Sequence, residues 1–395
     1  MTRRVAITLA APANDMVQEE IIKQVAFLSV DLRNAAFSAS GDTLECDVPI
    51  EQVDALTPQI QALAKRVQAS LRRLERKVVF SNLDAAQFDG IQQQHELPGV
   101  HFLGLGQAAL DGIALRLFRY FDRTFEALGE MWPVEPLLTP TLIPARVLAK
   151  CDYFRSFPQN VTFASHLEPN VQTIDSFRTR HADRETLDDA AASDMPSPDT
   201  CLSPATCYHV YHLHSGTIVP AAGTVHGVCG KCFRFESTNT SDLRRLWDFT
   251  MREIVFMGTR EQVWQHREVG LERTAALLTE HRLASEIRTA SDPFFTAPDA
   301  MAKTYFQLSS ETKYEIAALL PDGQRLAIGS LNYHTDFFGR AFDVQVQGGG
   351  FMHSVCIAFG LERCVYAFLR QHGTDPARWP EAVRRGTGGL RTSVR

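Results

Sequence analysis

The sequence contains no long apolar segment. None of its 395 residues lies in an apolar run near the roughly 18 residues that a membrane-spanning helix requires. The short apolar stretch 5–11 is soon followed by acidic residues, so it does not resemble a signal peptide. We therefore expect a soluble, cytoplasmic protein that does not bind a membrane.

The chain also lacks a basic surplus and a high cysteine content. Its formal net charge is −6, so it has no global positive field of the kind that gives non-specific nucleic-acid affinity. Eight cysteines among 395 residues are far too few for a disulfide-stabilised scaffold. In a cytosolic chain such thiols are more often buried, metal-binding or catalytic, so each cysteine needs its own interpretation.

Residues 1–85 predict a small N-terminal module with a βαββα order. The hydrophobic periodicity indicates strands at 5–9, 35–38 and 44–48 and helices at 17–28 and 57–77. The second helix separates an apolar face from a largely basic remainder that includes Lys65 and Arg66. We interpret the basic residues as solvated surface, with a docking surface for an acidic protein or RNA as the alternative.

Residues 100–385 predict the main domain, and residues 386–395 a flexible tail. Helices are expected at 106–128, 259–283 and 358–371, strands at 315–320 and 327–334, and an exposed polar insertion at 180–200. Strands and helices do not alternate as regular βαβ units. This pattern favours an α+β fold around an antiparallel sheet with flanking helices.

Two segments carry residues suited to nucleotide chemistry. The first is a predicted hairpin, 232–236 and 249–254, in which strand alternation puts Arg234 and Glu236 on one face and Phe249 and Glu253 on one face. The second, 348–363, reads as a glycine-rich strand that enters a helix near Arg363. An arginine at that point suits a triphosphate tail. Taken separately, Arg234 is equally compatible with a surface ion pair, and Arg363 with a charge on the face of a helix.

Together, these segments resemble the signature motifs of class II aminoacyl-tRNA synthetases. Residues 233–236 are similar to motif 2, 360–363 to motif 3, and the proline-bearing stretch 136–144 to motif 1, which implies a homodimer. The resemblance narrows to atypical seryl-tRNA synthetases and their truncated relatives, the amino acid:[carrier protein] ligases. That narrowing rests on four further segments, 202–208, 251–253, 330–334 and 353–356.

The resemblance implies a zinc ion, Zn²⁺, held by Cys207, Glu253 and Cys356. These residues lie far apart in the chain, so their spacing alone does not indicate a metal site. Three protein ligands leave one tetrahedral position open, as in a catalytic zinc site, and an α-amino group can fill it. The implied substrate is therefore a small amino acid.

Other cysteines and histidines offer competing interpretations. Cys229 and Cys232 form a C-x-x-C pair that suits a redox couple or half of a zinc site. His209, His212 and His214 alternate in a possible strand and resemble a metal-binding face. The remaining thiols show no partner and are interpreted as buried or incidental: Cys46, Cys151, Cys201 and Cys364.

The resemblance also implies how ATP is used. Arg234 balances the charge that develops at the α-phosphate, and Glu236 positions the nucleotide. Phe249 stacks on adenine, Arg363 holds the distal phosphates, and Mg²⁺ accompanies the triphosphate. Ser330 and Asn332 line the amino acid pocket. The product is an aminoacyl adenylate, and retention of these residues argues against a non-catalytic paralogue.

The acceptor of the aminoacyl group is either the thiol of a phosphopantetheinylated carrier protein or a tRNA hydroxyl. The carrier is favoured because the net charge of −6 offers little attraction for tRNA. On the predicted helix 259–283, four residues are expected to meet carrier carboxylates: Arg260, His266, Arg267 and Arg273. The basic helix at 57–77 keeps an atypical seryl-tRNA synthetase as the alternative, since the compact ligases lack a module like 1–85.

Overall fold

The centre of the molecule is an eight-stranded sheet. The computed structural model describes residues 1–29, 31–71, 74–86, 88, 97–235, 242–294 and 300–388. Neighbouring strands are antiparallel except for the parallel edge pair β12–β7, which confirms the expected α+β class. The strand order is β4 (Val78–Ser81), β14 (Ser285–Thr289), β15 (Lys313–Leu319), β16 (Arg325–Tyr333), β18 (His353–Gly360), β13 (Asp248–Gly258), β12 (Thr224–Phe233) and β7 (Val134–Leu137).

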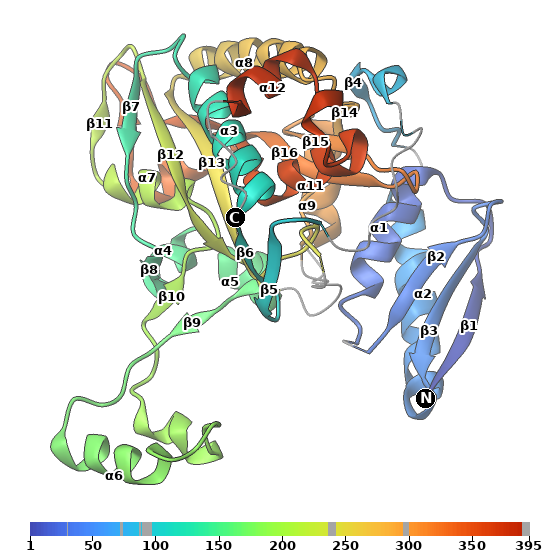
Figure 1. Cartoon of the computed structure of the whole chain (residues 1–395), viewed down its shortest axis with the longest axis vertical. Helices are drawn as coiled ribbons and strands as arrows, with labels where there is room; N and C mark the ends of the chain where they lie inside the picture. Colours follow the sequence, from blue (N-terminus) through green and yellow to red (C-terminus); the bar gives the residue numbers. More distant parts are fainter. Residues whose placement is uncertain are drawn as a thin grey trace.

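The two faces of this sheet have separate hydrophobic clusters. On the face that we call the back, Val355, Ile357 and Phe359 of β18 pack under helices α3 (Gly112–Leu128), α8 (Arg260–Glu280) and α11 (Leu361–His372). On the front face, Cys356 and Ala358 belong to a cluster with α7 (Cys207–Leu213), α10 (Phe337–Phe342) and α4 (Ala145–Lys150). Figure 1 shows the helices of the two faces around the central strands.

The N-terminal module has the βαββα order that its sequence predicts. Its sheet has the order β1-β3-β2, and its elements are β1 (Thr2–Thr8), α1 (Asp15–Val25), β2 (Arg33–Phe37), β3 (Thr43–Pro49) and α2 (Val53–Leu71). These elements share a core that also takes in Leu308 of α9 (Ala300–Ser309). The strand that follows α2 in the chain, β4, pairs with β14 in the large sheet, so the module is tied to the rest of the chain (Figure 1).

A narrow extension carries the polar insertion away from the body (Figure 1). Its base is a three-stranded sheet of β8 (Leu142–Pro144), β10 (Thr200–Leu202) and β9 (Phe163–Ala164), and its tip holds α6 (Val171–His181) and the 3₁₀ turn Asp189–Asp194. The remaining elements are short: β5 (Val100–Gly104), β6 (Gln107–Leu110), α5 (Tyr153–Ser156), β11 (Ile218–Val219), β17 (Gln345–Val346) and α12 (Glu381–Thr387). None of the helices in the described ranges is long and apolar enough to span a membrane.

Several predicted helix boundaries were wrong. The helix expected from residue 106 begins only at Gly112, because Gly106 takes a left-handed backbone (φ 62°) in the turn that joins β5 to β6. The last predicted helix begins at Leu361, since residues 358–360 still pair with β13 as part of β18. The helix expected to reach residue 77 ends at Leu71 within the described residues.

Candidate active site

Strand register brings distant parts of the sequence together on the front face. Cys356 of β18 lies opposite Asn332 of β16, which in turn lies opposite Lys313 of β15. In the next row, Ala358 lies between Glu253 of β13 and Ser330 of β16. Directly opposed side chains on antiparallel strands have Cβ atoms about 5 Å apart. Several of the predicted site residues therefore share one small area.

Cys207, Glu253 and Cys356 form a compact buried cluster. Their ligand atoms, two sulfurs and one carboxylate oxygen, all lie within 4.8 Å of one another. The Cys356 Sγ donates to Glu253 Oε2 at 3.1 Å, and the backbone N–H of Thr206 donates to Oε1 at 3.2 Å. The three side chains come from the start of α7 and from two neighbouring strands. The fold thus brings together three residues that are too far apart in the sequence to form a local motif.

The cluster gathers acidic groups in a dry environment. A hydrogen bond with Cys356 lowers the pKa of Cys207, but burial and the nearby Glu253 charge outweigh it and raise that pKa. The hydrogen bond with Cys207 and burial raise the pKa of Cys356 well above its usual value. A divalent cation would reverse this balance, because it stabilises thiolates directly.

The donor set fits zinc better than magnesium or calcium. Zinc binds thiolates and carboxylates in tetrahedral sites, whereas the hard cations prefer oxygen ligands alone. Among the described residues, no other group of three cysteines, histidines or carboxylates lies as close together. The zinc site implied by the family resemblance thus has three suitable donors, with a fourth position left for a ligand.

Arg234 and Phe249 lie together at the end of the β12–β13 hairpin. The Arg234 Nε donates to the carbonyl of Pro204 at 2.9 Å, and its guanidinium stands 5.4 Å from the centre of the Phe249 ring. Pro204 precedes Cys207 by three residues, so this bond ties the arginine to the segment that carries a cluster cysteine. Glu236, predicted to share the face of Arg234, lies outside the described residues.

Arg363 is anchored to the backbone on both sides. It lies in the first turn of α11, and its Nε and one terminal nitrogen donate to the carbonyls of Arg244 at 2.7 Å and Ala327 at 3.1 Å. These bonds fix the stem of the arginine where β18 ends. The predicted position beside a helix start is thus observed, while a phosphate contact stays a prediction.

Ser330 and Asn332 contact each other on β16. The Asn332 Nδ2 donates to Ser330 Oγ at 3.0 Å, and the Asn332 Oδ1 is buried with no hydrogen-bond partner among the described residues. A buried acceptor without a partner costs free energy unless a ligand or water supplies a donor. The pair is therefore suited to bind a polar group of a small molecule.

Sequence reasoning missed Asp292 and Lys313. The Lys313 ammonium forms an ion pair with Asp292, and Gln307 Nε2 donates to the other carboxylate oxygen at 2.7 Å. Burial would raise the pKa of Asp292, but the Lys313 charge and these hydrogen bonds lower it to about 2, with a further contribution from Arg234. The only local signal was an Asp-Pro turn after a strand, which does not indicate a pocket.

The structure does not favour the two competing interpretations, the C-x-x-C pair and the metal-binding face of histidines. Cys229 and Cys232 are three apart on β12 and therefore point to opposite faces, with Cys229 near Asp122 of α3. His209 and His212 lie on helix α7 and His214 directly follows it, so the three side chains are not on a strand and do not share a face by alternation. His214 instead hydrogen-bonds His226, with the two Nε2 atoms 2.9 Å apart.

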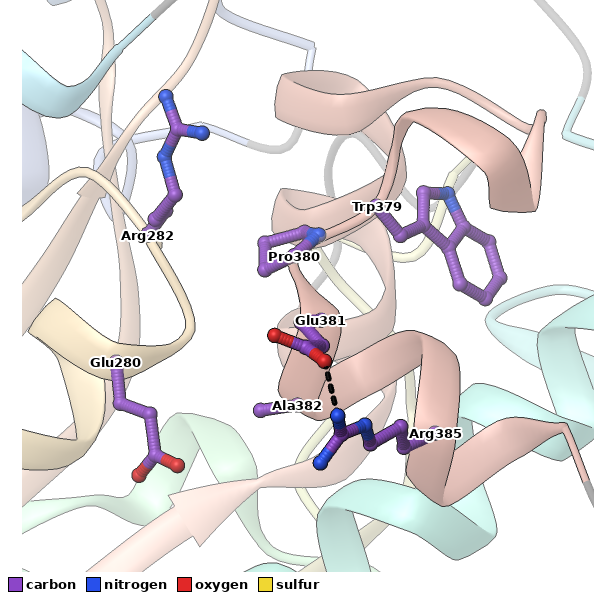
Figure 2. Close-up of a pocket in the computed structure, with 7 residues that line it drawn as sticks. All are labelled: Glu280, Arg282, Trp379, Pro380, Glu381, Ala382 and Arg385. Carbon is purple, nitrogen blue, oxygen red and sulfur yellow. Dashed lines mark ion pairs between the residues drawn. The ribbon is translucent and has the colours of Figure 1, made fainter.

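A surface cavity lies away from this site. It has a volume of about 460 Å³ and is lined by the end of α8 and the start of α12, including Arg282 and Trp379. Figure 2 shows Glu381 and Arg385 paired on one wall. Both helices belong to the back side of the sheet. The cavity is therefore separate from the Cys207–Glu253–Cys356 cluster.

Comparison with proteins of known name finds relatives of this chain. No family model matches the chain. It is 33% identical over 252 residues to amino acid–[acyl-carrier-protein] ligase 1 of Bradyrhizobium diazoefficiens, covering 63% of this chain and 75% of that protein. Ligase 2 of the same organism is 33% identical over 296 residues, with 73% and 84% covered. A type-2 serine–tRNA ligase of Methanopyrus kandleri is 25% identical over 298 residues, with 71% and 56% covered.

Solved structures share the fold. The seryl-tRNA synthetase of M. kandleri, in complex with tRNASec of A. aeolicus, has a TM-score of 0.68 at 20% identity and covers 98% of this chain and 77% of its own. The seryl-tRNA synthetase of Pyrococcus horikoshii complexed with ATP has a TM-score of 0.55 at 14% identity, with 86% and 80% covered. The central sheet is thus that of class II synthetases. Given its identity to the two Bradyrhizobium proteins, the chain belongs to the family of amino acid–[acyl-carrier-protein] ligases.

Proposed function

We propose that this protein activates a small amino acid with ATP and transfers it to the phosphopantetheine thiol of a carrier protein. In the first step the amino acid carboxylate attacks the α-phosphate and pyrophosphate leaves. In the second the thiol attacks the carbonyl carbon and AMP leaves. The convergence of Cys207, Glu253 and Cys356 near Arg234, in a chain of this family, carries the proposal.

The nucleotide is assigned to the area around Arg234. Its guanidinium is held over Phe249 by the Pro204 carbonyl, so it is pre-oriented and costs little reorganisation when charge develops on the α-phosphate. Phe249 offers a ring for adenine, and Arg363 and Mg²⁺ balance the distal phosphates. Glu236, which we assign to nucleotide positioning, lies outside the described residues.

The amino acid is assigned to the row that runs from the Cys207–Glu253–Cys356 cluster across β16. A zinc ion held by the cluster would supply a Lewis-acid position for the α-amino group. Asn332 offers its unpartnered Oδ1 to a donor of the substrate, and Ser330 orients that amide. Cys356 and Asn332 are directly opposed on neighbouring strands, so a ligand held at the cluster would lie beside the Asn332 amide.

The predicted carrier-binding surface on α8 is less basic and less exposed than the sequence indicated. Arg267 is 1% exposed and lies between the rings of Trp264 and Tyr314, and His266 is half-buried against Phe256. Only Arg260 and Arg273 of the four predicted carrier contacts are exposed, beside the exposed carboxylates of Glu261, Glu268, Glu272 and Glu280. The carrier assignment therefore rests on the two Bradyrhizobium relatives rather than on a basic α8.

Transfer to tRNA is the second candidate. The synthetase from M. kandleri covers 98% of this chain, so its fold has a counterpart for most of the N-terminal module. Lys65 and Arg66 are exposed on α2 of that module. Both observations are reasons to include tRNA as an acceptor in the assay, as a test of seryl-tRNA synthetase activity.

A homodimer is also proposed. The edge strand β7 overlaps the start of the predicted motif 1, and exposed apolar side chains flank it, with Leu138 90% exposed, Met131 47% and Leu142 47%. A second copy would remove these side chains from water. All eight cysteines are unpaired thiols, which suits the reducing cytoplasm that we propose as the location. Light scattering of the purified chain tests the dimer.

Two linked assays test the function. Amino-acid-dependent exchange of pyrophosphate into ATP, scanned over the twenty amino acids, identifies the substrate. The labelled amino acid is then offered with ATP to holo carrier protein, to carrier without its arm, and to total tRNA. We expect exchange with small amino acids and label on the holo carrier only. Labelled tRNA with an unlabelled carrier would establish the synthetase instead, and no exchange would overturn both.

A further inference from the structure

The contact between the N-terminal module and the main sheet lies next to the proposed amino acid pocket. Helix α1 carries Glu20, which is 4% exposed and accepts a hydrogen bond from Ser291 Oγ at 3.1 Å. The next residue along the chain, Asp292, forms the ion pair with Lys313 on the front face. Two consecutive residues thus contact the module and the pocket.

Helix α9 also has two consecutive residues of which one contacts the N-terminal module and the other contacts Asp292. Leu308 is 9% exposed and completes the hydrophobic core of the module, with Met301 packed against the same core. Gln307, immediately before Leu308, donates to Asp292 Oδ2 and accepts from the Asp292 backbone N–H, both at 2.7 Å. The module therefore fixes residues on both sides of Asp292. A displacement of α1 or α2 would move the partners that orient the Asp292 carboxylate.

Ion pairs and strand pairing strengthen the same connection. Glu19 of α1 bonds Arg76 in a bidentate pair at 2.8 Å and also contacts Arg288 of β14 at 3.3 Å. Lys77 exchanges hydrogen bonds with Thr289, two residues before Ser291. These groups are partly or fully buried, so their geometry is held more firmly than that of exposed pairs.

Asp292 and Lys313 stand at the far end of the row that begins at Cys356. Lys313 is two strands away from Cys356, about 10 Å at the usual strand spacing. An amino acid held by its α-amino group near Cys356 would extend over Asn332 toward this ion pair. The pair thus closes the side-chain end of the proposed pocket.

We propose that the N-terminal module positions the Asp292–Lys313 pair and so sets the affinity and size preference of the amino acid pocket. This inference rests on the proposed function for the identity of the substrate. Glu20, Ser291 and Leu308 act as positioning residues that do not touch it. The module then has a role in substrate selection that is independent of which acceptor is used.

The test compares Glu20→Gln and Ser291→Ala with the matched control Glu45→Gln. Glu45 also lies in the module, but its pair with Arg4 is exposed and faces away from α9. Ser291→Ala loses one hydrogen bond to a charged group and should raise the KM for the amino acid about tenfold, whereas Glu20→Gln keeps a neutral acceptor and should raise it less. The KM for ATP should be unchanged in both variants. In an Asp292→Asn background the Ser291 substitution should add no further effect, since both act through the same carboxylate.

Hydrogen exchange provides a readout that does not depend on activity. We expect Ser291→Ala to reduce protection of residues 291–294 and 312–314 and to leave β18 unchanged, whereas Glu45→Gln changes neither. Unchanged protection would overturn the positioning role itself. Reduced protection with equal changes in both KM values, or effects that add to those of Asp292→Asn, would overturn the link to the pocket. A wild-type chain without amino-acid-dependent exchange would instead overturn the proposed function.

Discussion

The front and back faces of the large sheet are built from the same strands but carry different side chains. On β18, Ile357 and Phe359 face the back, and Phe359 stacks on Phe125 with ring centres 3.9 Å apart. Cys356, the residue just before Ile357, faces the front and meets Glu253 and Cys207. Apolar packing on the back holds the strands in register, so that polar groups on the front can be held in a fixed geometry.

The two faces also contribute differently to the free energy of folding. Burying apolar groups stabilises the fold, whereas burying thiols, carboxylates and an orphaned amide oxygen costs free energy unless a ligand or cation compensates. The front face retains such groups at Cys207, Glu253 and Asn332. The comparison therefore assigns stability mainly to one face and chemistry to the other.

The sharpest contrast is between two arginines on the β12–β13 hairpin, the half-buried Arg234 and the buried Arg252. Arg234 faces the front, while Arg252 faces the back and bonds Asp122 at 2.8 Å and Glu126 at 3.2 Å. Arg234→Ala should lower the rate of adenylate formation about 100- to 1,000-fold, the usual effect of removing one preorganised donor to a developing charge. Pyrophosphate exchange measures this loss.

Arg252→Ala should behave in the opposite way. It removes a buried arginine from ion pairs whose carboxylates, Asp122 and Glu126, are partly exposed, so we expect the free energy of unfolding to fall by about 2 kcal/mol. The exchange rate per folded molecule should stay within about threefold of the wild type. Equal losses of activity in the two variants would contradict the assignment of catalysis to the front face and stability to the back face.

A smaller change tests the back face alone. Ile357 is fully buried under α8, so Ile357→Val should lower the free energy of unfolding by about 1 kcal/mol through loss of one methylene group. The KM values should not change. Val171→Ala, at a side chain 77% exposed on α6, is the matched control and should leave the unfolding midpoint in denaturant unaltered.

The smallest effect is a pH dependence at the end of α11. Burial lowers the pKa of His372 from 6.5 to about 4, outweighing a hydrogen bond to the Arg282 carbonyl. Below pH 6.5 the unfolded chain binds a proton that the folded chain does not, so stability falls as the pH drops toward 4. Between pH 7 and pH 6 the loss should be about half a kcal/mol. Denaturant titrations should show a flatter profile for His372→Gln, and an identical slope would contradict the assignment.

Local patterns predicted much of this arrangement. Strand alternation placed Phe249 and Glu253 on one face, and in the structure Arg234 lies over the Phe249 ring and near Glu253, while Phe249 also packs against the back cluster. The alternation argument failed for His209, His212 and His214, because their spacings of three and two residues fit a short helix as well as a strand. A pattern that short does not distinguish the two periodicities.

Long-range pairing set the limit of what the sequence could predict. Cys207, Glu253 and Cys356 were proposed only through family resemblance, because their proximity depends on β13 pairing with β18 and on α7 packing over both. Asp292 and Lys313 had no such signal. Their contact follows from the β14–β15 pairing and from Gln307 on α9, which no local window reveals.

The front-face cluster offers the most direct test of this account. Metal content and pyrophosphate exchange should be measured together on the wild type, on Cys207→Ser and on Cys229→Ser, whose thiol lies on the back of β12. We expect about one zinc ion per chain and full exchange in the wild type and in Cys229→Ser, with both lost in Cys207→Ser because its open three-ligand site is dismantled. Zinc-free protein that activates amino acids at the wild-type rate would contradict the account.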